Sequence, residues 1–124
     1  MDSLIRGNST DGAIRVFSAI TTDLVNEAHR IHDTSATASA ALGRLLTAAA
    51  ILGAQLKGEE DSTTLQINGD GTLGMLVAVS DSQSRVRGYV ENPHGDLPPK
   101  SKGKLDVGGA IGAGYLSIIR DLNM

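Results

Sequence analysis

The glycine-rich segment GDGTLG, residues 69–74, has the spacing of a dinucleotide-binding fingerprint. In that fingerprint a helix begins at the third glycine, and the N-terminus of the helix binds the pyrophosphate of the nucleotide. Here the residues after Gly74 read MLVAVS, a pattern that is typical of a strand. The Asn-Gly and Asp-Gly pairs favour a hairpin, because their glycines supply positive φ angles readily. We therefore predict a structural turn, with positive φ at its first two glycines, formed by Asn68, Gly69, Asp70 and Gly71.

Two histidines, His29 and His32, lie three residues apart, and Glu27 and Asp33 flank them. At this spacing the two rings share one face of a helix, as a pair of metal ligands would. No third ligand stands at a fixed spacing from the pair, so the pattern favours a solvated helix surface. We predict no metal site and no bound cofactor in this chain.

Two serines, Ser9 and Ser39, are candidate nucleophiles by residue type alone. Neither stands in the glycine-flanked turn that exposes a catalytic serine, and the sequence indicates no Ser-His-acid arrangement. We therefore predict no catalytic residue and expect that the chain is not an enzyme.

The strand-like segment GMLVAVS, residues 74–80, is apolar on both sides. Met75, Val77 and Val79 point one way, and Leu76 and Ala78 point the other. One interpretation is a strand that other elements cover on both faces. The other is a strand with one face on the core and one apolar face that contacts a partner. The bulkier row of Met75, Val77 and Val79 is then the candidate contact surface.

The longest element predicted by the sequence is an Ala-rich helix, which includes the stretch TASAALGRLLTAAAILGAQLKG at residues 37–58. Its uninterrupted apolar run, Leu45 to Ala54, is half of the roughly 20 residues that a membrane span needs, so we expect no membrane partner. Apolar residues occur on every side, which is typical of a helix buried all round. We predict that this helix starts at Thr34-Ser35, stops at Lys57-Gly58 and lies at the centre of the fold.

Arg44 is the one charge in the first part of this helix. If the position is buried, the guanidinium needs a carboxylate or carbonyl partner, because an unpaired buried charge is very costly. Alternatively, the long side chain extends to solvent. The sequence favours neither alternative.

The remaining sequence predicts an α+β fold. A first helix begins at Asp23, with Thr21 or Thr22 as its cap, and a short helix spans residues 105–111. Strands are expected at residues 2–6, 13–20, 63–68, 74–80, 85–91 and 115–122. This order predicts a single domain, residues 1–124, with mixed or antiparallel sheets packed around the long buried helix.

The composition excludes several classes of protein. The 124 residues carry a net charge of −3 and contain one Phe, two Tyr and no Trp, so nucleic-acid binding is disfavoured. The chain has no Cys, which excludes disulfides, thiolate zinc sites and cysteine nucleophiles within it. With neither cysteine nor a secretory leader, the cytoplasm is the expected location.

Several long motifs, taken in order, resemble the N-terminal portion of the redox-regulated bacterial heat-shock chaperones, the heat-shock-protein-thirty-three family. The similarity runs from about Asp2 to Leu122 and is carried by the segments TTDLVNEAHRIH, TASAALGRLLTAAAILGAQLKG, LQINGDGTLGMLVAVSD, VRGYVENP and GKLDVGGAIG with GYLSIIRDL. At the start of the long helix, Ala36 stands where family members often carry proline.

The resemblance implies an ATP-independent holdase that binds unfolding client proteins and acts as a homodimer. It also implies a C-terminal four-cysteine zinc domain, whose oxidation exposes apolar surface. That domain is absent from this chain, so we expect an incomplete N-terminal chaperone domain, with Met75, Val77 and Val79 as candidate client-binding residues. Two alternatives stay open, namely a small nucleotide- or metabolite-binding enzyme domain and a structural dimerisation domain.

Overall fold

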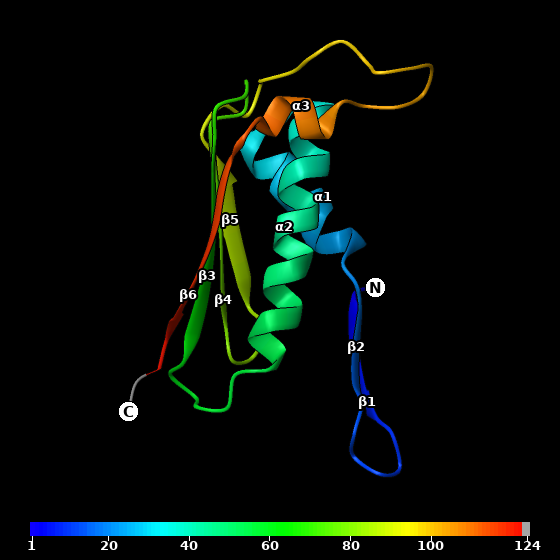
Figure 1. Cartoon of the computed structure of the whole chain (residues 1–124), viewed down its shortest axis with the longest axis vertical. Coiled ribbons are helices and arrows are strands. Elements are labelled where there is room, and N and C mark those ends of the chain that lie inside the picture. The colour runs from blue at the N-terminus through cyan, green and yellow to red at the C-terminus, as the bar shows by residue number, and fades with distance from the viewer. Residues whose placement is uncertain (123–124) are drawn as a thin grey trace.

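Helix α2 (Ala36–Ala54) lies between a four-stranded sheet and a smaller N-terminal unit in the computed structural model, which describes residues 1–122 (Figure 1). The N-terminal unit is a hairpin of β1 (Ser3–Asn8) and β2 (Arg15–Ile20), followed by α1 (Thr22–His32). The sheet contains β3 (Ser62–Gly69), β4 (Met75–Asp81), β5 (Val86–Val90) and β6 (Gly114–Asp121). A short helix, α3 (Val107–Ile111), precedes β6 and packs against α2.

Every strand pair in the described part of the chain is antiparallel. The order in the larger sheet is β5-β4-β3-β6, so β3 and β4 are central and β6 pairs along the far side of β3. The register places Ser62 opposite Asp121 and Gly69 opposite Gly114. These findings confirm the α+β class, and the sheets are antiparallel rather than mixed.

The apolar core lies between α2 and the sheet, as the composition of the helix predicts. Leu42, Leu46 and Ala49 of α2 pack with Leu65 and Leu76 of the sheet, and each of these side chains is at most 2% exposed. On the opposite side α1 covers the helix, and Val25 sits directly over Gly43. A Cβ atom at position 43 would lie 2.9 Å from a Val25 methyl carbon, so the missing side chain sets the spacing of the two helices.

Arg44 is exposed, and this observation decides between the two alternatives for its charge. The side chain lines two surface hollows, one shared with Val25 of α1 and one beside Leu105. Water therefore solvates the guanidinium, and the charge needs no buried partner.

The N-terminal end of α2 is confirmed, and its C-terminal end is not. The Ser35 hydroxyl accepts a hydrogen bond from the Ala38 amide at 3.1 Å, which is the expected cap. The helix ends at Ala54, three residues before Lys57. The amides of Gln55 and Leu56 bond to carbonyls three residues back, at 3.1 Å each, so the last turn tightens and leaves the α-helical geometry early.

Helix α1 has its N-cap at Thr21, one of the two predicted positions, but its capping hydrogen bonds come from a residue far away in the sequence. The carboxylate of Asp2 accepts hydrogen bonds from the amides of Asp23 and Leu24, both at 2.8 Å. Thr21 is at the cap position but makes no side-chain cap bond, and its hydroxyl instead meets the Thr47 hydroxyl of α2 at 2.7 Å. The first residues of the chain therefore fix the start of α1.

We expect Asp2→Ala to lower the free energy of unfolding by about 1 kcal/mol, because two amides of α1 lose their acceptor and the negative charge at the helix N-terminus is removed. Urea unfolding followed by circular dichroism measures the change. Thr22→Ala is the matched control, since it removes a hydroxyl from the first helical residue and leaves the cap in place. Equal stability of Asp2→Ala and the parent would contradict this assignment.

By length and apolar character, α2 is the one helix in the described chain that could cross a membrane. More than half of the relevant stretch is buried within the fold, against the sheet, α1 and α3. The burial pattern is that of a core helix.

Candidate functional site

Strand β4 separates its two apolar rows onto opposite faces of the sheet. Leu76 and Ala78 are fully buried against α2, and Ser80 shares that row. Met75, Val77 and Val79 point to the other face and are only half-buried. The alternation of the sequence therefore predicts the two rows correctly. In the described part of the chain no second layer covers the row of Met75.

Neighbouring strands widen this row into an apolar surface on the side of the sheet away from α2. The register places Val77 opposite Tyr89 of β5, and the same face of β6 carries Tyr115 and Ile119. Tyr115 is 80% exposed, Ile119 55% and Tyr89 43%. We call this surface the open face and define it by six residues: Met75, Val77, Val79, Tyr89, Tyr115 and Ile119.

Polar side chains of β3 run through the middle of the open face. Gln66 lies between Val77 and Ser117, and Thr64 lies between Val79 and Ile119. The Gln66 amide also approaches the Met75 sulfur at 3.2 Å. The surface thus consists of two apolar bands, one on β4 and β5 and one on β6, with the polar side chains of β3 between them. A molecule that contacts both bands also contacts these hydrogen-bonding groups.

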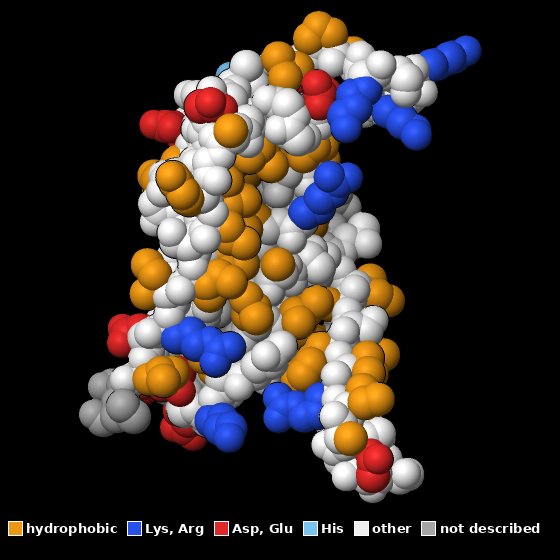
Figure 2. Space-filling model, in the orientation of Figure 1, with side chains coloured by type: hydrophobic (Ala, Val, Ile, Leu, Met, Phe, Trp, Pro, Cys, Tyr) orange, Lys and Arg blue, Asp and Glu red, His pale blue; other side chains and the backbone are white. Residues whose placement is uncertain are grey.

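Strand β6 adds exposed apolar area on the opposite face as well. Leu116 is 58% exposed and Ile118 is 51% exposed, although Leu65, the register partner of Ile118, is fully buried. Helix α2 packs on β3, β4 and β5, and its cover does not extend to these two side chains. Figure 2 shows hydrophobic side chains exposed along the strands at the left of the view and along the β1–β2 hairpin at the right.

The glycine-rich segment forms a turn, but its predicted backbone conformation is wrong. Gly69 is the last residue of β3, and neither Gly69 nor Gly71 has positive φ; the left-handed residue is Gly74, at φ 70°. The first two glycines instead allow close approach, because a Cβ atom at Gly69 would lie 2.0 Å from the carbonyl oxygen of Ile111, and one at Gly71 would lie 2.2 Å from that of Ala110.

The rest of this segment docks on the end of α3. The Asp70 carboxylate accepts a hydrogen bond from the Ala113 amide at 2.8 Å, and the Asp70 amide donates to the Ala113 carbonyl at 3.1 Å. Asn68 lies inside β3, opposite Met75. Strand β4 begins directly after Gly74, so no helix N-terminus is available there for a pyrophosphate group. Asn68 and Gly69 thus belong to β3, and the turn itself is closed by the hydrogen bond from the Gly74 amide to the Gly71 carbonyl.

The histidine region contains a contact that the sequence did not reveal. His29 Nδ1 lies 3.1 Å from both the Thr34 and Ser39 hydroxyls, and these hydroxyls are 2.6 Å apart. Thr34 is 4% exposed, so the cluster joins the end of α1 to the start of α2. Within residues 1–122 no carboxylate pairs with His29, and no three His, Asp or Glu side chains gather as a metal cluster would require.

The fold and this surface together define a class: an α+β domain whose most distinctive feature is exposed apolar sheet surface. Contiguous exposed apolar area is typical of proteins that contact other polypeptides.

The comparisons with known proteins assign the family. The family model described as Hsp33 protein matches residues 2–124, and the chain belongs to this family. The 33 kDa chaperonin of Clostridium acetobutylicum is 50% identical over 99% of the chain, and that of Ruminiclostridium cellulolyticum is 48% identical over the same share. A crystal structure of the 33 kDa chaperonin from Thermotoga maritima, a heat shock protein 33 homolog, aligns with a TM-score of 0.92 and 40% identity over 98% of the chain.

These comparisons confirm the resemblance and the fold class. The chain spans 42% of the two clostridial relatives and 41% of the Thermotoga structure.

Proposed function

We propose that this chain forms part of an ATP-independent holdase, a chaperone that binds unfolding proteins and keeps them from aggregating. The observation that carries the proposal is the open face, which exposes aromatic and aliphatic side chains on the side of the sheet that faces away from α2. An unfolding client exposes apolar segments of the same chemistry. The family to which the chain belongs and the chaperonin names of its relatives support this function.

The open face suits a client without a fixed sequence. Its apolar bands would bury aliphatic and aromatic client groups, and burial stabilises by about 25 cal/mol for each Å² removed from water. The amide of Gln66 and the hydroxyl of Thr64, which lie between the bands, would satisfy polar groups of an extended client. Binding of this kind needs no nucleotide, and the turn at residues 69–74 offers no site for one.

We further propose that the active protein is a cytoplasmic homodimer. Strand β6 pairs with β3 along one edge, and within the described residues its other edge has no strand beside it. An unpaired strand edge with exposed apolar side chains on both faces is a ready template for another strand. A second copy of the protein is the proposed partner.

Zinc, which the resemblance implies, is proposed for the region of the whole protein outside this chain. The family's four-cysteine site requires thiolates, and the chain contains no cysteine, so its residues do not fit that group. No thiol-based redox step can therefore be assigned to this chain.

Light scattering from a heat-unfolded client tests the proposed function. We expect the chain to lower the scattering to the same extent before and after mild peroxide and before and after a zinc chelator. This constancy is expected because the chain has no thiolate to act as sensor. A chain that is inert under all conditions, or one that works only after oxidation, would contradict the proposal.

A further inference from the structure

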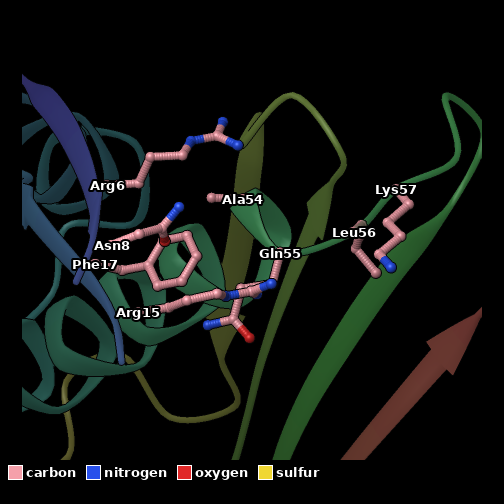
Figure 3. A pocket seen from close by; sticks show the side chains of 8 residues that line it. All are labelled: Arg6, Asn8, Arg15, Phe17, Ala54, Gln55, Leu56 and Lys57. Carbon is pink, nitrogen blue, oxygen red and sulfur yellow. The ribbon is translucent and has the colours of Figure 1, made fainter. Parts of the chain in front are cut away.

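Three cationic side chains line one small hollow between the β1–β2 hairpin and the C-terminal end of α2 (Figure 3). Arg6 comes from β1, Arg15 from β2, and Lys57 from the segment that follows the helix. The hollow has a volume of about 230 Å³, and its lining is completed by Asn8, Phe17, Ala54, Gln55 and Leu56. No acidic side chain contributes to it.

This local charge runs against the charge of the whole chain, which is −3. The ion pairs recorded among residues 1–122 involve Glu27 with Arg30, Asp81 with Arg85, Asp33 with His94 and the N-terminal amine with Asp23. None of them neutralises Arg6, Arg15 or Lys57. A concave site that carries one sign of charge concentrates counter-ions of the opposite sign, so the hollow attracts anions.

The hairpin register holds the two arginines on the same side. Arg6 is paired with Phe17 and Asn8 with Arg15, so all four side chains leave the hairpin toward the end of α2. The Arg15 guanidinium lies 5.7 Å from the centre of the Phe17 ring, a cation–π contact that restrains it. In Figure 3 the two arginines extend toward the helix end on either side of Phe17 and Asn8.

The donor set identifies the chemistry of the ligand. A guanidinium presents planar pairs of N–H donors that match the oxygens of a phosphoryl group, and a lysine ammonium adds a point charge. The side-chain amides of Asn8 and Gln55 add further donors. At about 230 Å³ the hollow is smaller than the roughly 300–1,000 Å³ of typical small-molecule pockets, which favours a small anion over a whole nucleotide.

We propose that this hollow is a binding site for a small phosphoryl anion, held by Arg6, Arg15 and Lys57. The competing explanation is that the three cations only complement the carbonyl groups at the end of α2, where helices carry partial negative charge. The two explanations differ in whether an added anion binds, and they are independent of the holdase function.

The test uses inorganic pyrophosphate as the probe and isothermal titration calorimetry of the 124-residue chain at constant ionic strength. We expect saturable binding with one site per chain. Arg15→Gln and Lys57→Gln should each weaken the affinity about tenfold, the factor that about 1.4 kcal/mol represents. Lys100→Gln is the matched control, because it removes the same charge from a separate basic hollow beside Arg44.

A second arm with ADP distinguishes free phosphoryl anions from nucleotides. Pyrophosphate should bind more tightly than ADP, since the hollow is too small for a nucleoside. If ADP instead binds more tightly, and Arg15→Gln abolishes that binding, the phosphoryl group that the site recognises is the diphosphate of a nucleotide. Absence of saturable pyrophosphate binding would overturn the proposal. An equal loss of affinity in Lys100→Gln would also overturn it, by showing unspecific charge attraction. Circular dichroism of Lys57→Gln, whose side chain lies outside both strands, verifies that the fold is retained.

Discussion

Gly53→Val is expected to lower the free energy of unfolding by about 3 kcal/mol, the upper part of the usual range for an overpacked core. Gly53 lies in the last turn of α2, where the helix touches the end of β4. A Cβ atom there would lie 2.1 Å from the Ser80 hydroxyl oxygen and 2.6 Å from the Asp81 carbonyl oxygen. The backbone oxygen cannot rotate away, so the helix and the strand must separate. Urea unfolding followed by circular dichroism measures the loss.

Gly108→Val is the matched control for this prediction. Gly108 also lies in a helix, α3, and a Cβ atom at that position has no neighbour within 4 Å. Valine has a somewhat better helix propensity than glycine, so stability should stay level or rise slightly. Equal urea midpoints for the two variants would show that the contact between α2 and β4 is looser than described.

Val77→Asp is expected to abolish most of the suppression of client aggregation while the chain stays folded. Val77 lies at the centre of the open face, between Tyr89 and Gln66, and its side chain is only half-buried. A carboxylate there would have to lose its hydration when an apolar client segment packs on the surface, and that desolvation is very costly. Light scattering of a heat-unfolded client, with circular dichroism of the variant, measures both parts of the expectation.

Two controls separate the surface from the core. Ala78→Asp changes the next residue of the same strand, which is fully buried against α2, and it should unfold the chain. Asn26→Asp adds the same charge on the exposed side of α1 and should leave both fold and scattering unchanged. Unfolding of Val77→Asp would place Val77 in the core and contradict the open face as a client surface.

Local sequence signals predicted most of the helices and strands. They failed for features that depend on contacts between residues far apart in the sequence. The start of α2 was predictable because Ser35 and the amide it caps lie three residues apart. The acceptor that caps α1 was not predictable, because the β1–β2 hairpin separates Asp2 from the helix in the sequence. The glycines at positions 69 and 71 were expected for their positive φ angles, but the structure requires them for another reason. A side chain at either position would collide with a carbonyl group of residue 110 or 111, and the local sequence does not show that contact.

The candidate site shows the same division. The alternation of β4 predicts which row faces away from the core, and the structure confirms that Met75, Val77 and Val79 share that face. The aromatic part of the open face was not predictable, because Tyr89 and Tyr115 join it only through the strand order β5-β4-β3-β6. The contact of His29 with Ser39 likewise depends on how α1 folds back on α2.

The pairing of β3 with β6 has a consequence for synthesis on the ribosome. Strand β3 ends at Gly69, and its outer partner begins only at Gly114. At about 5–20 residues per second, several seconds pass between the emergence of the two strands. During that interval one edge of β3 has no partner, and an unpaired strand edge is a site of aggregation. The nascent chain therefore passes through a state in which the edge of β3 is open to pairing with other chains until β6 covers it.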